Sequence, residues 1–162
     1  MTKHELVETG YRIFSEFEKP SLLQESRDLD PEGRAHEALL KSRKRNTLQL
    51  DDVAGIGYNP ITCITPEGMA YFMPRLLELA LDIESNSKSE AEPYLWGFIL
   101  QIMPNSNEDR FRRFRSEHYC HVCSVLRFIE DNFISYIKEQ LMENEFEITL
   151  KAWCAKCAQQ ST

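Results

Sequence analysis

Helix start signals recur along this chain, and they constrain its fold more than any other feature. Thr2 and Glu5 have the spacing of a capping box, in which each side chain accepts a hydrogen bond from the other residue's backbone N–H. Residues 30–32 and 65–67 each place a capping side chain, a proline and an acid in succession, as the first turn of a helix favours. These signals predict helices over about residues 3–18, 31–44 and 66–83.

Apolar periodicity predicts the remaining helices. Between Tyr119 and Ile137 apolar residues recur at steps of three and four, which is typical of the buried face of a helix. Further helices are expected over about residues 94–103, 116–142 and 146–158, and the segment 61–64 is a strand candidate. Pro74 should kink the helix over residues 66–83, which we expect at the centre of the fold. The predicted fold class is all-α, a single compact bundle of about five to six helices.

The chain has 162 residues, the size of one domain. We therefore expect a single helical domain over residues 1–162, with 84–92 as a surface linker and 143–162 as a C-terminal extension. No apolar segment approaches the roughly 20 residues of a membrane-spanning helix. The N-terminal residues lack the apolar core of a signal peptide, which predicts a cytoplasmic protein whose five cysteines are thiols.

The net charge of −7 disfavours nucleic acid as a partner, because phosphate binding requires clustered Lys and Arg. A basic protein would suit this charge better. The alternative is that the charge only maintains solubility.

Two Cys-x-x-Cys pairs form the sharpest motif. Four thiolates so arranged could hold a structural zinc ion tetrahedrally. The candidate metal ligands are Cys120, Cys123, Cys154 and Cys157. Both pairs also fall where helical periodicity places buried residues, and neither contains the Gly or Pro of a zinc knuckle, so packing as small hydrophobes is the favoured interpretation. A redox dithiol is a third interpretation.

Two basic segments are candidates for phosphate binding. Residues 110–115 interleave four arginines with Phe111 and Phe114, a composition that can stack on bases. We favour a structural interpretation, in which the phenylalanines pack inward and the arginines pair with surface acids. Residues 41–45 carry four cations, which suit the C-terminal end of a helix.

Catalytic and cofactor-binding motifs are not found in the sequence. It contains no nucleophile elbow, phosphate-binding loop or His-Glu-x-x-His, and the glycines at 55 and 57 lack the third glycine of a dinucleotide site. No catalytic or cofactor-binding residue is therefore predicted, and an enzyme with a composite pocket stays a third hypothesis.

The segment 64–77 resembles a motif of a family of small uncharacterised bacterial proteins, in which a Pro-Glu-Gly turn is followed by Tyr-aromatic-x-Pro and leucines. The matching residues here are Pro66, Glu67, Gly68, Tyr71 and Pro74. The resemblance implies a bacterial cytoplasmic helical protein, and it supplies no catalytic residue and no cofactor. The physical interpretation of the motif is structural: it begins a helix, and its aromatic residues anchor neighbouring segments.

The leading functional hypothesis is a non-enzymatic protein-binding module, such as an immunity or antitoxin-like inhibitor of a basic toxin. The alternative is a zinc-stabilised regulatory domain that uses the two Cys-x-x-Cys pairs.

Overall fold

A computed structural model describes residues 1–25, 30–54, 59–86, 94–104 and 108–159, and it confirms the all-α prediction. Over these residues the only β pairing is an isolated bridge between Gln24 and Ile64. The α-helices are α1 (Lys3–Ile13), α2 (Pro31–Ser42), α3 (Leu50–Val53), α4 (Pro66–Leu81), α5 (Ile83–Asn86), α6 (Tyr94–Ile102), α7 (Ser116–Glu139) and α8 (Glu143–Gln159). Three 3-10 turns join them: η1 (Phe14–Glu16), η2 (Arg45–Thr47) and η3 (Glu108–Phe111). The glycines at 55 and 57, and most of the linker predicted over 84–92, lie outside the described residues.

The predicted capping residues begin three of these helices. The Thr2 side chain accepts a hydrogen bond from the Glu5 backbone N–H at 3.2 Å, while the Glu5 carboxylate accepts one from the Thr2 backbone N–H at 2.7 Å. Asp30 caps α2, and Thr65 caps α4. These interactions satisfy backbone donors that the first turn of a helix leaves free, which is why the starts were readable from the sequence.

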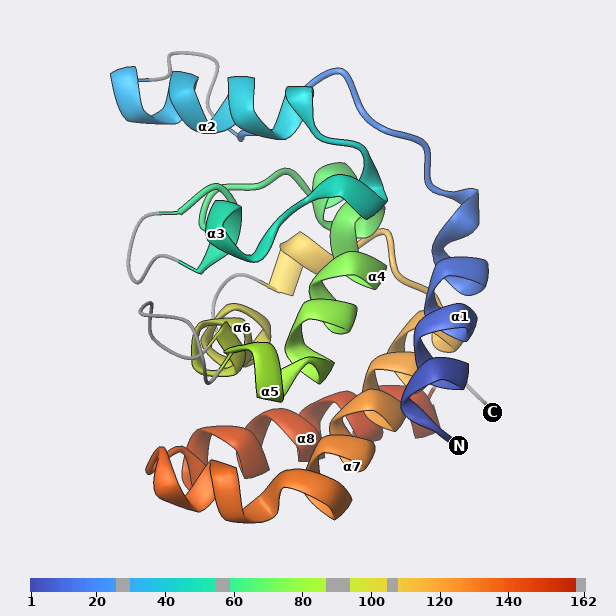
Figure 1. Ribbon diagram of the computed structural model, residues 1–162. Helices are drawn as coiled ribbons and strands as arrows, with labels where there is room; N and C mark the ends of the chain where they lie inside the picture. The colour runs from blue at the N-terminus through green and yellow to red at the C-terminus, as the bar shows by residue number, and fades with distance from the viewer. Residues whose placement is uncertain (26–29, 55–58, 87–93, 105–107, 160–162) are drawn as a thin grey trace.

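Helix α4 is the central element of the fold (Figure 1). Twelve of its sixteen residues are buried, so it is covered on nearly every side rather than along one stripe. It packs against α1, α6 and α7, and Figure 1 shows the other helices arranged around it. Pro74 lies inside α4, and the helix continues through it to Leu81.

The mostly buried carboxylate of Glu37 binds the chain at Leu23 and Gln24, in the segment that precedes α2. The Glu37 carboxylate, on α2, accepts hydrogen bonds from the backbone N–H groups of Leu23 at 3.1 Å and Gln24 at 2.7 Å, and it pairs with Lys41 at 3.1 Å. Because these partners satisfy its oxygens, a mostly buried carboxylate is tolerated here. Glu37 thereby holds the extended chain against α2.

Two glycines in helices should respond in opposite ways to a methyl group. A Cβ on Gly10 in α1 would lie 2.7 Å from Nε2 of His121, on α7, whereas a Cβ on Gly97 in α6 would meet no atom within 4 Å. We expect Gly10→Ala to destabilise the protein by about 1–3 kcal/mol through overpacking. Gly97→Ala should stabilise it by up to about 1 kcal/mol, because alanine is the better helix former.

Chemical denaturation of the two variants measures both changes in the free energy of unfolding. A gain in stability from Gly10→Ala would contradict the close approach of α1 and α7.

Candidate functional site

Helices α7 and α8 form an antiparallel hairpin, joined by a short turn at residues 140–142 (Figure 1). Leu141 in this turn has a φ of 54°, a left-handed conformation that is uncommon for a residue other than glycine. Apolar side chains fill the interface along the hairpin. The buried ones include Ile129, Ile137, Met142, Phe146 and Leu150.

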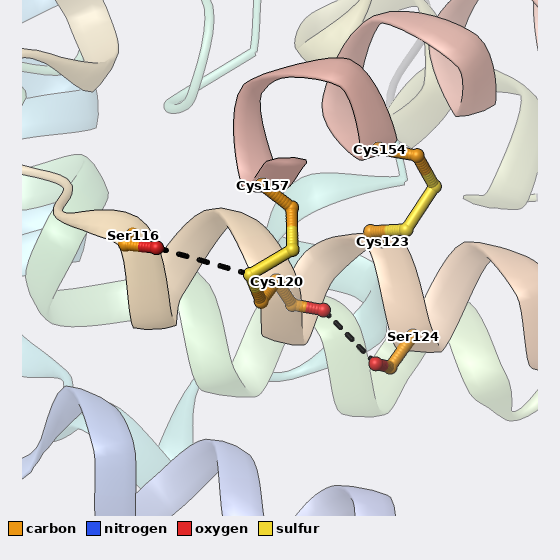
Figure 2. Close-up of a disulfide and its surroundings, with 6 residues drawn as sticks. All are labelled: Ser116, Cys120, Cys123, Ser124, Cys154 and Cys157. Carbon is orange, nitrogen blue, oxygen red and sulfur yellow. Dashed lines mark hydrogen bonds between the residues drawn. A yellow bond between two sulfur atoms is a disulfide. The ribbon is translucent and has the colours of Figure 1, made fainter. Parts of the chain in front are cut away.

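Two disulfides cross-link the base of this hairpin (Figure 2). One joins Cys120 to Cys157 with a Cα–Cα distance of 4.6 Å, and the other joins Cys123 to Cys154 at 5.0 Å. Each bond connects one Cys-x-x-Cys pair to the other rather than closing within a pair. The two bonds are therefore successive rungs between the facing sides of α7 and α8.

The prediction that all five cysteines are thiols is wrong for these four, and Cys63 is the one free cysteine among the described residues. Periodicity placed each pair on the inner face of its own helix, but it could not show that the two faces meet at disulfide distance. Disulfides persist mainly in oxidising compartments, so this state does not support the predicted cytoplasmic location. None of the described helices is long and apolar enough to cross a membrane.

The predicted zinc ligands are brought together by the same geometry. The four sulfurs form two bonded pairs one helical turn apart, and a sulfur in a disulfide has no thiolate to offer a metal. Two serine hydroxyls lie near Cys120 (Figure 2). The Ser116 hydroxyl is 4.0 Å from the Cys120 sulfur, and the Ser124 hydroxyl donates to the Cys120 carbonyl at 2.9 Å. The disulfides therefore leave none of these four sulfurs free as a thiolate ligand.

The far end of the hairpin, residues 130–148, forms a surface that we name the acidic tip. Its acids are Glu130, Asp131, Glu139, Glu143, Glu145 and Glu147. Lys138 is the only cation in this segment, so six negative charges and one positive charge give a net −5, against −7 for the whole chain. The chain's excess negative charge is therefore concentrated at one end of one hairpin.

Exposed apolar side chains lie within the same segment. Leu141 is 82% exposed, Ile148 43% and Ile134 40%, which is half of the large hydrophobic residues that the described chain exposes. Helix α7 has an irregular backbone at Phe133 (φ −133°, ψ 22°), next to Asn132, whose side-chain amide donates to the carbonyl of Phe128 at 2.8 Å. An unbroken helix would pair this carbonyl with the Asn132 backbone N–H, so the side-chain amide competes for that acceptor next to the kink. The acidic tip thus combines apolar and charged groups on a bent hairpin end.

A second cluster lies at the start of α7, where His118 is fully buried beside Glu16. The ligand atoms of Glu16, Glu117 and His118 lie within 4.8 Å of one another, which is close enough to suggest a metal site. However, Nδ1 of His118 accepts the Arg115 backbone N–H at 2.9 Å, so the proton of the neutral ring is on Nε2, which lies 3.3 Å from the Glu16 carboxylate. A protonated Nε2 cannot ligate a metal, and this histidine is better explained as a structural residue that caps α7.

A cleft between α1 and α4, whose lining includes Tyr11, Arg75 and Glu78, is a candidate for a composite active site. Its polar groups satisfy one another: the Glu78 carboxylate accepts the Tyr11 hydroxyl and an Arg75 N–H, each at 2.7 Å, and Arg75 also donates to the Leu48 carbonyl at 2.8 Å. Burial, followed by the contact with Glu78, raises the pKa of Tyr11 well above its usual range. Tyr11 therefore stays protonated at neutral pH and cannot act as a base there, which leaves the enzyme hypothesis without a base from this tyrosine.

The basic segments stabilise the fold. Phe111 and Phe114 are buried, and the guanidinium groups around them bind Thr62, Asp109 and Glu16. In residues 41–45, Arg43 makes a bidentate ion pair with Asp52 at 2.8 and 2.9 Å, and Arg45 donates to the Tyr71 carbonyl at 2.7 Å. The buried phenylalanines and two of the arginine contacts follow the structural interpretation of residues 110–115, whereas Arg110 donates to a carbonyl and not to an acid. Of the cations in residues 41–45, only Lys41 lies in the last turn of α2, where a cation was expected to complement the helix dipole.

The residues of the Pro-Glu-Gly motif lie on α4, away from the acidic tip. Pro66 and Pro74 are buried, and a Cβ on Gly68 would lie 2.8 Å from the Ile64 side chain. The Tyr71 hydroxyl accepts the Arg45 backbone N–H at 3.0 Å, and Glu67 lies 3.5 Å from Arg112. Each residue of the motif thus has a packing or pairing role in the fold.

Comparison of the chain with protein-family models, with curated proteins and with solved structures finds no match. The resemblance noted in the sequence therefore stays an expectation.

Proposed function

We propose that this protein is a non-enzymatic protein-binding module that presents the acidic tip to a basic protein partner. The observation that carries the proposal is the concentration of net charge −5 around exposed Ile134, Leu141 and Ile148 at one end of the hairpin. An immunity or antitoxin-like inhibitor of a basic toxin is the most specific form of this function.

The composition of the acidic tip suits a protein interface. Apolar side chains supply the area that is desolvated on binding, and surrounding charges steer a partner of opposite sign and raise the association rate. The two disulfides brace the base of the hairpin, and a braced surface loses less conformational entropy when it binds. The tip is therefore both complementary to a basic surface and preorganised for it.

Affinity purification from the native host, followed by calorimetry with the recovered protein, tests this function. We expect the double variant Leu141→Ser/Ile148→Ser to weaken binding of that partner by at least about tenfold, since truncation of a central contact typically costs more than 1 kcal/mol. The matched control is Leu22→Ser/Leu100→Ser, which removes two exposed leucines, 46% and 38% exposed, away from the tip.

Charge is tested separately with Glu139→Gln/Glu143→Gln/Glu147→Gln. This variant should associate more slowly than the wild type at low salt, and the difference should shrink as salt is added. The acidic tip would be refuted as the interface by the opposite result. In that case the partner would bind both tip variants as it binds the wild type, and it would not bind the Leu22→Ser/Leu100→Ser control.

A further inference from the structure

We infer that the four cysteines at the base of the hairpin form a zinc-binding site when their disulfides are reduced, so that the hairpin has two alternative covalent states. The site would use Cys120 and Cys123 from α7 with Cys154 and Cys157 from α8. This inference does not rest on the proposed function, because it concerns the base of the hairpin and not the acidic tip.

The hairpin gathers the four sulfurs into one cluster, as two bonded pairs one helical turn apart. Tetrahedral zinc thiolates have Zn–S distances of about 2.3 Å, which puts neighbouring sulfurs about 3.8 Å apart. Within each helix the two cysteines are three residues apart, so they lie on one face and are separated by about 4.5 Å along the axis.

Across the hairpin the Cα–Cα distances are 4.6 and 5.0 Å, with the sulfurs bonded. Breaking each S–S bond lets the two sulfurs move apart by rotation about χ1, while the two rungs approach one another slightly. Small movements of side chains and of the helix pair, and not a new fold, therefore convert two rungs into a four-sulfur cage.

The conversion balances with a dithiol reductant as the co-reactant. Two dithiol molecules each give two electrons and two protons, so that both protein disulfides become four thiols and both reductants become disulfides. Zn²⁺ then binds the four cysteines as thiolates, and the four thiols release their four protons. Two molecules of a disulfide oxidant reverse the sequence: each accepts two electrons and two protons to become a dithiol, the four thiolates become two disulfides, and Zn²⁺ is expelled because a disulfide sulfur is no longer a thiolate ligand.

The packing of α8 explains why a second state of this cluster would matter. The buried residues of α8 are Phe146, Thr149, Leu150 and Trp153, so none lies beyond the level of the cysteines. Besides the cation–π contact of Lys156 with the Tyr119 ring at 5.5 Å, the cross-links tie the last turn of α8 to α7, and zinc would replace them under reducing conditions. A chain in a reducing compartment could keep the hairpin closed in this way.

Metal analysis of the full chain tests the inference. The protein is reduced without oxygen, incubated with zinc and passed through gel filtration, next to a sample kept oxidised. We expect the reduced protein to retain about one equivalent of zinc through gel filtration, because structural zinc sites bind tightly. The oxidised protein should retain less than about a tenth of an equivalent. Cobalt in place of zinc should give the absorption of a tetrahedral tetrathiolate site.

Two variants distinguish a specific four-cysteine site from non-specific zinc binding by exposed thiols. Cys123→Ala/Cys154→Ala leaves two of the four proposed ligands. This variant should lose zinc affinity by at least about a hundredfold, which is the upper end of the loss caused by mutating residues that only support the ligands. Cys63→Ala removes the fifth cysteine and should bind as the wild type does. Circular dichroism should show that zinc restores any helix that reduction has removed.

Failure of the reduced wild type to bind zinc would overturn the inference. Retention of full affinity by Cys123→Ala/Cys154→Ala, or binding without a helical far-ultraviolet spectrum, would overturn it as well.

Discussion

Removal of both disulfides should lower the free energy of unfolding by about 6 kcal/mol, and removal of either one alone by only about 2.5 kcal/mol. The bonds span sequence separations of 37 and 31 residues. Closing a loop of that length in the unfolded chain accounts for about 4 kcal/mol in the chain-entropy model. Because one bond lies inside the loop of the other, the second bond closes only a ring of about eight residues, four from each helix, and adds about 2.5 kcal/mol.

The variants for this measurement are Cys120→Ala/Cys157→Ala, Cys123→Ala/Cys154→Ala and the combination of the two. Guanidinium unfolding should show a loss in the quadruple variant that exceeds the sum of the two double variants, together with a larger m-value because its unfolded chain is less compact. Cys63→Ala serves as the control and should change stability by no more than about 1 kcal/mol. Equal stability of the quadruple variant and the wild type would contradict the cross-linked hairpin.

The loss expected from the quadruple variant is comparable to the total stability of a typical domain, about 5–15 kcal/mol. The disulfides are therefore a large part of what keeps α8 in place. When the disulfides of the wild type are reduced, a zinc ion bound to the four cysteines would offset the loss, since a ligand that binds only the folded state stabilises it; the quadruple variant has no such ligands.

The helix starts could be predicted because their information is local. Thr2 and Glu5 satisfy each other's backbone groups, and Asp30 reaches the Gly33 backbone N–H at 2.7 Å. Such contacts lie within one turn of the chain. The start of α7 at Ser116 was also expected, although the contact that secures it there is the Arg115 backbone N–H bound to the His118 ring.

Helix ends were harder to predict because distant residues set them. The first helix was expected to reach residue 18, but α1 ends at Ile13 and a 3-10 turn follows. Phe14 is fully buried in this turn, with its ring 5.3 Å from that of Phe114 and 4.6 Å from that of His118. The end of α1 thus coincides with the packing of Phe14 against Phe114 and His118, which lie about a hundred residues further along the chain. A local sequence pattern cannot predict such a distant contact.

The two candidate sites were hidden from the sequence for the same reason. The acidic residues of the tip can be identified in the sequence, but only the hairpin places residues 130–139 beside residues 143–148. Both Cys-x-x-Cys pairs could also be identified in the sequence. Only the packing of α7 against α8 brings the sulfurs of one pair within bonding distance of those of the other. Sequence alone identified the chemical groups, while tertiary structure determined their combination.

Trp153→Ala should destabilise the protein by about 3–5 kcal/mol, the cost of deleting a large buried aromatic side chain. Trp153 is 3% exposed on α8, and its ring centroid lies 4.9 Å from that of Phe111 and 5.3 Å from that of Tyr119. Its indole N–H donates to the carbonyl of Ile102, at the end of α6, at 2.8 Å. This one side chain therefore joins the hairpin to α6 and η3.

Trp153→Phe separates the packing from the hydrogen bond. Phenylalanine keeps an aromatic ring in the site but leaves the Ile102 carbonyl without its donor, so we expect a smaller loss, of which about 1–3 kcal/mol comes from that unpaired group. If Trp153→Phe were as damaging as Trp153→Ala, the hydrogen bond rather than the packing would dominate.

Hydrogen exchange should then show where Trp153→Ala acts. The disulfides still bind α7 to α8 in this variant, because Cys154 and Cys157 are untouched. Amides of α6 should lose protection, while those between residues 120 and 126 of α7 should keep most of theirs, since local opening follows the contacts that remain. An equal loss across α6 and α7 would mean that the hairpin and the rest of the protein unfold as one unit, and that Trp153 is not a joint between two separately stabilised parts.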